Sequence, residues 1–177
     1  MKIALLGFSG SGKSTLSAKL GSFYKIPVFY FDQIQFNSGW TVTSKEEKLQ
    51  KTKEFMDNYD QWIMDGNYAN YYLERRVEEA DKIIILIFNR FNCLYRIFKR
   101  YKQYKNKTRP SMAPGRNEKI DWEFIQWILW KGRTREDKKR YNEIKSKYPQ
   151  KVVFIKNQKQ LNKLEADIFY NKLWSTS

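Results

Sequence analysis

Histidine is absent from this chain of 177 residues, and cysteine occurs once, at Cys93. The missing histidine excludes Ser-His-Asp and Cys-His nucleophilic chemistry and leaves carboxylates, lysines and tyrosines for any proton transfer. A single cysteine excludes an internal disulfide bond and a zinc site built from several cysteines. Cys93 lies near the start of an expected helix, and we interpret it as a small buried residue.

Long hydrophobic runs are also missing. The longest uninterrupted apolar run is Ile83 to Phe88, whereas a membrane-spanning helix needs about 20 such residues. The run from Ile3 to Leu6 is shorter than the apolar stretch of about 7 to 15 residues in a signal peptide. The sequence therefore predicts a cytoplasmic protein with no membrane partner. Its length and its hydrophobic content of 41% predict one domain covering residues 1–177.

Acidic residues are few in comparison with basic residues. The chain has 34 lysines and arginines against 19 aspartates and glutamates, which gives a net charge of +15. Such a balance favours polyanionic partners, either phosphate compounds or nucleic acid, and charge alone does not choose between them.

Short apolar segments alternate along the chain with segments of helical periodicity. Leu16, Leu20, Phe23 and Tyr24 recur at spacings of three and four residues, which predicts a helix with one buried face. Thr43 or Ser44, with Glu47, forms a capping signal for a second helix. Strands are expected at 2–6, 27–31, 62–64, 83–88 and 152–155. The alternation predicts an α/β fold in which helices cover a parallel sheet.

The loop after the first expected strand carries the most specific motif. The pattern G-x-x-x-x-G-K-[ST] of a phosphate-binding P-loop is matched from Gly7 to Ser14. Glycines let successive amide groups turn toward an anion, and the following helix adds the positive end of its dipole. Lys13 is expected to reach the β and γ phosphates, and Ser14 to hold Mg²⁺. The alternative is a plain glycine turn. The predicted nucleotide-binding residues are Gly7, Ser9, Gly10, Ser11, Gly12, Lys13, Ser14 and Thr15.

Two aspartates follow expected strands. Asp32 and Asp65 each lie where ligands bind at the carboxyl edge of an open parallel sheet. A carboxylate there can orient Mg²⁺ or accept a proton from an attacking hydroxyl. We predict both as catalytic residues and Asp65 as a metal ligand; the alternative is an aspartate that stabilises a turn or caps a helix.

Basic residues are dense from Tyr95 to Arg116. Prolines and a glycine in the later part predict a basic, lid-like insertion at about 104–120. Arginines in such a lid can stabilise the charge of a transferring phosphoryl group. Arg96 and Arg100 are one helical turn apart and are expected to point the same way. The alternative for each is a solvated helix face. The predicted catalytic arginines are Arg96, Arg100, Arg109 and Arg116.

Aromatic residues cluster in the next segment. Trp122, Phe124, Trp127 and Trp130 lie close to basic residues, an arrangement that can stack the bases of single-stranded nucleic acid. Their spacing is also typical of a helix facing the core, and we favour core packing. Gly132 is expected to interrupt this helix.

Several ordered motifs resemble the adenylate kinase-like P-loop proteins and, within them, the family of DNA topology modulation proteins. The resemblance rests on GFSGSGKSTLSAKL at 7–20, FDQIQFNSGW at 31–40, WIMDGNY at 62–68, NRFNCLYRIFKRY at 89–101 and RPSMAPGRNEKIDWEFIQWI at 109–128. It implies a three-layer fold with a five-stranded parallel sheet, ATP binding and phosphotransferase activity. It also implies an alternative, an ATP-switched nucleic-acid-binding protein that affects DNA topology.

The chain departs from the adenylate kinases after Asp65-Gly66. A proline and an arginine follow shortly in that family, whereas Asn67 and Tyr68 follow here. Arg75 or Arg76 is then the nearest substitute for the arginine that binds the monophosphate. The chain does not contain the Thr-Gly-Asp acceptor motif of adenylate kinases, and Asp32 stands nearest instead, as a carboxylate does in sugar and small-molecule kinases of similar shape.

Overall fold

A computed structural model describes residues 1–35, 43–104, 120–170 and 174 of the chain. The strands are β1 (Lys2–Gly7), β2 (Val28–Tyr30), β3 (Trp62–Asp65), β4 (Lys82–Leu86) and β5 (Val152–Ile155). The helices are α1 (Lys13–Tyr24), η1 (Gln33–Gln35), α2 (Lys45–Asn58), α3 (Leu73–Glu79), α4 (Arg90–Tyr104), α5 (Trp122–Gln126), η2 (Trp127–Lys131), α6 (Arg135–Lys147) and α7 (Gln158–Phe169).

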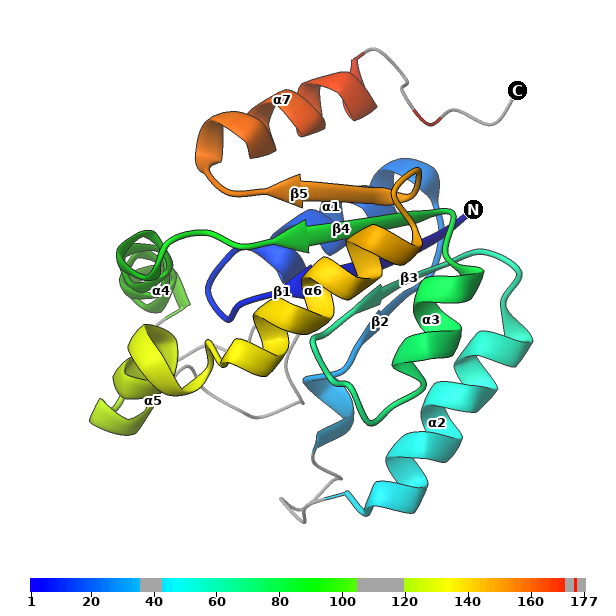
Figure 1. Ribbon diagram of the computed structural model, residues 1–177, viewed down its shortest axis with the longest axis horizontal. Helices are drawn as coiled ribbons and strands as arrows, with labels where there is room; N and C mark the ends of the chain where they lie inside the picture. The colour runs from blue at the N-terminus through cyan, green and yellow to red at the C-terminus, as the bar shows by residue number, and fades with distance from the viewer. Residues whose placement is uncertain (36–42, 105–119, 171–173, 175–177) are drawn as a thin grey trace.

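The strands form one parallel sheet in the order β2-β3-β1-β4-β5 (Figure 1). Strand β1 is central, and its residues from Ile3 to Gly7 are buried. Strand β4 beside it is buried from Ile83 to Leu86. Uninterrupted apolar strands of this kind are typical of a sheet covered on both faces. The predicted α/β fold with a five-stranded parallel sheet is confirmed.

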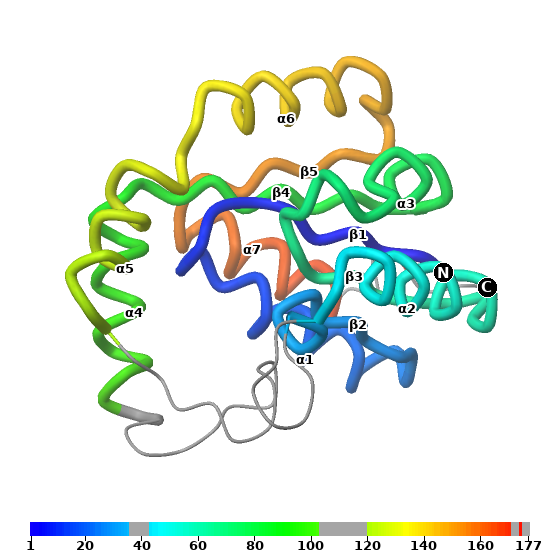
Figure 2. The backbone as a smooth tube through the Cα atoms, turned by 90° about the horizontal axis from the view of Figure 1, so that it is seen from below, coloured from blue at the N-terminus to red at the C-terminus, as the bar shows by residue number. Residues whose placement is uncertain are grey.

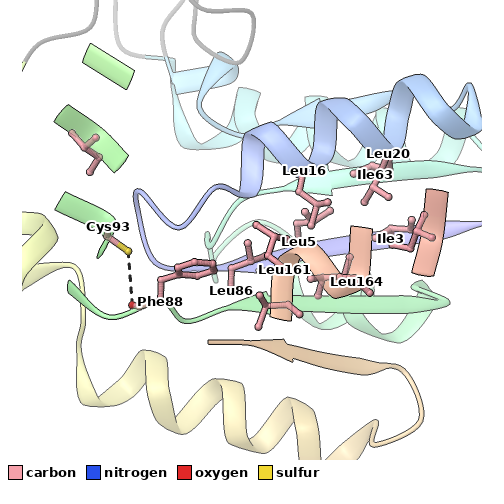
Figure 3. Packing of buried hydrophobic residues seen from close by; sticks show 14 of the residues in the cluster. Ile3, Leu5, Leu16, Leu20, Ile63, Leu86, Phe88, Cys93, Leu161 and Leu164 are labelled. Atoms are coloured by element: carbon pink, nitrogen blue, oxygen red, sulfur yellow. Dashed lines mark hydrogen bonds between the residues drawn. The ribbon is translucent and has the colours of Figure 1, made fainter. Parts of the chain in front are cut away.

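Alternate residues of β1 pack into two separate cores. Ile3 and Leu5 contact the side of α1 and α7, where Leu16 and Leu161 lie (Figure 3). Ala4 and Leu6 belong to the other core, which includes residues of α2, α3 and α6. Helices therefore cover both faces of the sheet (Figures 1 and 2), as the alternation of side chains along a strand requires.

Cys93 lies in the first of these cores. Its side chain is fully buried, and its thiol donates to the carbonyl oxygen of Phe88 at 3.8 Å (Figure 3). Burial raises the pKa of the thiol, which keeps it protonated. The interpretation of Cys93 as a small buried residue is confirmed.

The helix starts follow the capping signals. The hydroxyl of Ser44 accepts from the amide of Glu47 at 3.1 Å, so the capping signal expected there is confirmed with Ser44 as the cap. Asp121 caps α5 in the same way, accepting from the amide of Phe124 at 2.9 Å. Gly132 follows η2, a short π-helix, and ends the helical segment as expected.

The expected core packing of the aromatic segment is wrong for its tryptophans. Trp122, Trp127 and Trp130 are exposed by 65%, 48% and 56%, and the buried position is Ile128. Residues three to four positions apart lie on one face of a helix only where the helix has 3.6 residues per turn. Trp127 and Trp130 lie in the π-helix Trp127–Lys131, whose hydrogen bonds span five residues and change the direction of each side chain. Trp122 lies before this π-helix, at the first position of α5.

The predicted lid-like insertion lies almost entirely outside the described residues, and so do Arg109 and Arg116. No helix in the described part of the chain has both the length and the hydropathy that spanning a bilayer requires.

Candidate active site

The loop between β1 and α1 follows the path that its glycines permit. Gly7, Gly10 and Gly12 have φ angles of +129°, +76° and +99°, which side chains disfavour. A Cβ atom on Gly7 would lie 2.1 Å from the carbonyl oxygen of Leu86 in β4. A Cβ atom on Gly10 would lie 2.9 Å from the carbonyl oxygen of Cys93 in α4. Close packing of two neighbouring elements thus explains why the loop needs glycine.

Lys13 begins α1 and folds back along this loop. Its ammonium group donates to the carbonyl oxygens of Gly7 and Phe8, both at 3.0 Å. The side chain lines a cleft at the carboxyl edge of the sheet, together with Ser14 and Thr15. The amide groups of the first helical turn have no partner within the helix, so this wall of the cleft presents donors and positive charge.

Helix α4 supports the loop from outside. The guanidinium of Arg96 donates to the carbonyl oxygen of Ser11 at 3.0 Å, binds the side chain of Gln158, and stacks 4.2 Å from the ring centre of Phe88. Burial lowers the pKa of Arg96. Arg100, one turn later, lines the cleft, whereas Arg96 does not. The two arginines therefore have different surroundings.

The two aspartates line the same cleft as the loop. Strand β2 neighbours β3, and β3 neighbours β1, so Asp32 and Asp65 lie beside the loop at the same sheet edge. Both line one cleft of about 580 Å³. Asp65 is 5% exposed, and burial together with its charge raises the pKa of Tyr30. A buried carboxylate thus lines the same cleft as the donors of the loop.

Asp32 has a defined partner. Its carboxylate accepts a hydrogen bond from the hydroxyl of Tyr68 at 3.0 Å. Burial, followed by the charge of Asp32, raises the pKa of this phenol above its ordinary value. Tyr68 consequently stays protonated and orients Asp32 over the whole neutral range.

Helix α6 supplies cleft residues that the sequence analysis missed. Arg140 and Asp137 line the cleft and form an ion pair. Asn67, just after β3, donates to Asp137 at 3.2 Å and accepts from the hydroxyl of Tyr141 at 2.7 Å. The spacing of Thr134 and Asp137 is a capping signal that predicts the start of α6. No signal in the sequence indicates the contact with Asn67, which lies far away along the chain.

The segment after α5 also contacts the loop. The indole of Trp127 donates to the hydroxyl of Ser9 at 3.4 Å, and Phe124 and Trp127 both line the cleft. Arg133 donates to the carbonyl oxygens of Ile128 and Phe88 and lies 4.4 Å from the ring centre of Phe8. These contacts hold the end of η2 against the loop between β1 and α1.

Most of the predicted site residues that the structure describes share the cleft. Ser11 is the exception in the loop, since its side chain is fully buried and its amide donates to the carbonyl oxygen of Phe8. Arg96 lies behind the loop. The predicted residues that line the cleft are Gly7, Ser9, Gly10, Gly12, Lys13, Ser14, Thr15, Asp32, Asp65 and Arg100.

Neither arginine that was expected to replace the missing monophosphate-binding arginine lines the cleft. Arg76 is fully buried and donates to the carbonyl oxygens of Gly66 and Tyr68. Arg75 pairs with Asp57 and Glu79 on the surface. Both side chains are thus occupied in holding the fold, and the cleft arginines beyond α4 come from α6 instead.

Comparisons with known proteins give the fold. The YorR protein from Bacillus subtilis, solved in complex with phosphorylated GDP, has a TM-score of 0.52 and 18% identity; the match covers 98% of this chain and 96% of that one. Deoxyadenosine kinase from M. mycoides, solved with dCMP and dCDP, has a TM-score of 0.47 and 20% identity, covering 98% of each chain. No family model and no curated protein sequence matches the chain.

The fold and the loop are parts of one arrangement. The chain has a three-layer α/β fold with a five-stranded parallel sheet, similar to that of YorR, and the P-loop sequence motif begins at the end of its central strand.

Proposed function

We propose that this protein is an ATP-dependent kinase that transfers the γ-phosphoryl group to a hydroxyl or phosphate group of a nucleoside, a nucleotide or another small acceptor. One observation carries the proposal: the P-loop and two carboxylates, Asp32 and Asp65, line a single cleft. A loop of donors binds the triphosphate, and a carboxylate opposite it can prepare an acceptor. YorR, which has the same fold, holds a phosphorylated guanine nucleotide.

The loop wall would bind the donor nucleotide. The amide groups at the start of α1 would bind the β-phosphate, and Lys13 would neutralise charge on the β and γ phosphates. Lys13 already lies along the loop, within reach of an anion seated there. Arg100 would stabilise the charge that spreads over the transferring group.

The opposite wall would bind the acceptor. Asp32 would accept the proton of the attacking hydroxyl while Tyr68 holds its carboxylate in place. Arg140 is the cationic group on this side of the cleft and would bind a phosphate or another anionic part of the acceptor. Its partner Asp137 fixes the guanidinium in one position.

The residues present fit a magnesium ion. Ser14 and Asp65 supply one hydroxyl and one buried carboxylate, and Mg²⁺ prefers such oxygen ligands, completing its shell with water and phosphate oxygens. The described residues contain no cluster of three or more histidine, cysteine, aspartate or glutamate side chains, which agrees with an ion held mainly by the nucleotide. When bound, the ion would neutralise charge on the phosphates.

Transfer of labelled γ-phosphate from ATP tests the proposal. The acceptor panel would contain nucleosides, nucleoside monophosphates, small hydroxyl compounds and oligonucleotide 5′ ends, with magnesium present. We expect one acceptor class to be labelled, Lys13→Ala to lower the rate by about a hundredfold or more, and Asp32→Asn to lower it similarly.

Matched variants provide the controls. Lys159→Ala and Asp60→Asn make the same chemical changes at exposed positions away from the cleft, and should retain full activity. Absence of transfer to every acceptor, with ATP binding intact and dependent on Lys13, would overturn the proposal.

A further inference from the structure

One face of α4 exposes aromatic side chains. Phe91, Tyr95 and Phe98 are spaced by four and three residues, so they share one side of the helix, and they are exposed by 72%, 69% and 44%. The opposite side carries Cys93 and Ile97, which are fully buried in the core. The orientation of the helix is therefore fixed, and its aromatic side faces solvent.

The neighbouring segment exposes three more aromatic side chains. Helices α4 and α5 lie side by side (Figures 1 and 2), and Ile97 of α4 and Ile128 of η2, the helix that continues α5, belong to one core. Trp122, Trp127 and Trp130 are exposed on α5 and η2. We use the name aromatic face for the exposed aromatic residues of the neighbouring elements α4, α5 and η2, which are Phe91, Tyr95, Phe98, Trp122, Trp127 and Trp130.

The charges among these residues have one predominant sign. Helix α4 has five basic residues and no acidic residue. Across α4, α5 and η2, the exposed charged side chains in the described part of the chain are the cations Arg90, Lys99, Lys102 and Lys131 and one anion, Glu123. The face thus combines flat rings with positive charge.

We propose that the aromatic face binds single-stranded nucleic acid. Bases stack on exposed aromatic rings while lysines and arginines contact the phosphates, and this combination is independent of base sequence. A second copy of the chain would bring a second net charge of +15, which opposes self-association. Charge complementarity therefore favours a polyanion as the occupant.

Continuity with the cleft favours a strand over an anionic lipid surface. Trp127 belongs to the aromatic face and also lines the cleft, where its indole contacts Ser9 of the nucleotide-binding loop. A flexible strand can follow the rings into a cleft, whereas a flat bilayer cannot. The proposal concerns binding and does not depend on the kinase reaction.

Fluorescence anisotropy tests the proposal with the full chain and a labelled oligodeoxythymidylate of about 16 nucleotides. The test variant is Phe91→Leu with Tyr95→Leu, which keeps the net charge and an apolar surface but removes two rings. Stacking contributes about 1–3 kcal/mol per base, so we expect the affinity to fall at least about fivefold per ring. Wild-type affinity should fall steeply between about 50 and 200 mM salt.

A matched variant and two further measurements separate the other occupants. Phe23→Leu with Tyr170→Leu removes two exposed rings on the α1 and α7 side and should leave the affinity unchanged. Equal affinity of the test variant and wild type would overturn the proposal, because charge alone would then explain binding. Absence of binding to the strand would also overturn the proposal. Attachment to phosphatidylglycerol vesicles, or formation of a dimer in sedimentation, would then identify the other occupant.

Discussion

The two walls of the cleft are held in place by different kinds of contact, one by the backbone and the other by side chains. The loop wall is fixed by backbone: three glycines with positive φ follow a path set by β4 and α4. The proposed acceptor wall is the part of the cleft lined by Asp32 and Asp137, and side chains fix it. Tyr68 donates a hydrogen bond to Asp32, and Asn67 forms hydrogen bonds with both Asp137 and Tyr141.

This difference determines how each wall fails. Where the backbone fixes the path of a loop, the fold tolerates changes in the side chains of that loop. It does not tolerate a Cβ atom that meets a neighbouring main chain. A wall of side chains depends on individual polar atoms, and removing one leaves its partner unsatisfied. Substitutions in the two walls should therefore differ in both the size and the kind of their effects.

The largest effect should come from Gly7→Ala. The new Cβ atom would lie 2.1 Å from the carbonyl oxygen of Leu86, with the amide nitrogen of that residue at 2.8 Å. These are main-chain atoms of β4, so relief requires the β1–β4 pairing to open, and the φ of +129° adds strain. We expect a loss of about 3 kcal/mol or more in the free energy of unfolding, measured by urea denaturation.

Gly21→Ala is the matched control. Its Cβ atom would lie 2.4 Å from a side-chain methyl group of Val28 and 3.3 Å from the carbonyl oxygen of Ile26, and alanine favours a helix over glycine by about 1 kcal/mol. Its closest main-chain contact is thus longer than that of Gly7→Ala, and its effect should be smaller. Equal losses in the two variants would show that the close approach to the main chain of β4 is not what constrains the loop.

Arg76→Ala should have the next largest effect. The fully buried guanidinium donates to the carbonyl oxygens of Gly66 and Tyr68 and lies 4.4 Å from the ring centre of Phe31. Burial, with a contribution from Arg140, lowers its pKa. Its removal leaves two carbonyl oxygens unsatisfied and a cavity, so we expect a loss of about 3 kcal/mol, measured by thermal and urea unfolding.

The adjacent residue supplies the comparison. Arg75 is partly exposed and pairs with Asp57 and Glu79 at the surface. Arg75→Ala should therefore cost at most about 1 kcal/mol. A larger loss for Arg75→Ala than for Arg76→Ala would contradict the role of Arg76 as the buried donor that holds the backbone of Gly66 and Tyr68.

The sequence predicted the loop wall, because local geometry determines its path. The P-loop motif, the strand before it and the helix after it are contiguous, so their spacing defines the loop directly. Asp32 and Asp65 could be predicted because parallel strands bring their carboxyl ends to one edge of a sheet, wherever those strands lie in the chain.

The remaining residues depend on packing between distant segments. Asn67 and Asp137 are 70 positions apart, and their contact requires the angle at which α6 crosses the sheet. The periodicity of the sequence does not predict that crossing angle. Arg76 was considered for the acceptor side, but its burial depends on how α3 packs. The exposure of Trp127 and Trp130 was not predicted because a π-helix changes the direction of side chains.

The smallest effect on stability, and the sharpest test of the acceptor wall, should come from Tyr68→Phe. This substitution removes the hydroxyl that donates to Asp32 but keeps the ring, which packs 5.6 Å from the ring of Phe31. We expect at most about 1 kcal/mol of lost stability. If Asp32 is the base, kcat should fall about tenfold while KM for ATP is unchanged, because orientation of the carboxylate is lost.

Alkaline pH separates this role of the hydroxyl from simple packing. Burial raises the pKa of Tyr68 in the folded protein above the value of about 10 in the unfolded chain. The unfolded state then releases this proton first, so the contribution of Tyr68 to stability is complete below about pH 10 and declines as pH rises further. Unfolding measured against pH should show a steeper alkaline loss for wild type than for Tyr68→Phe. Parallel pH profiles for wild type and Tyr68→Phe would contradict the raised pKa of the Tyr68 hydroxyl.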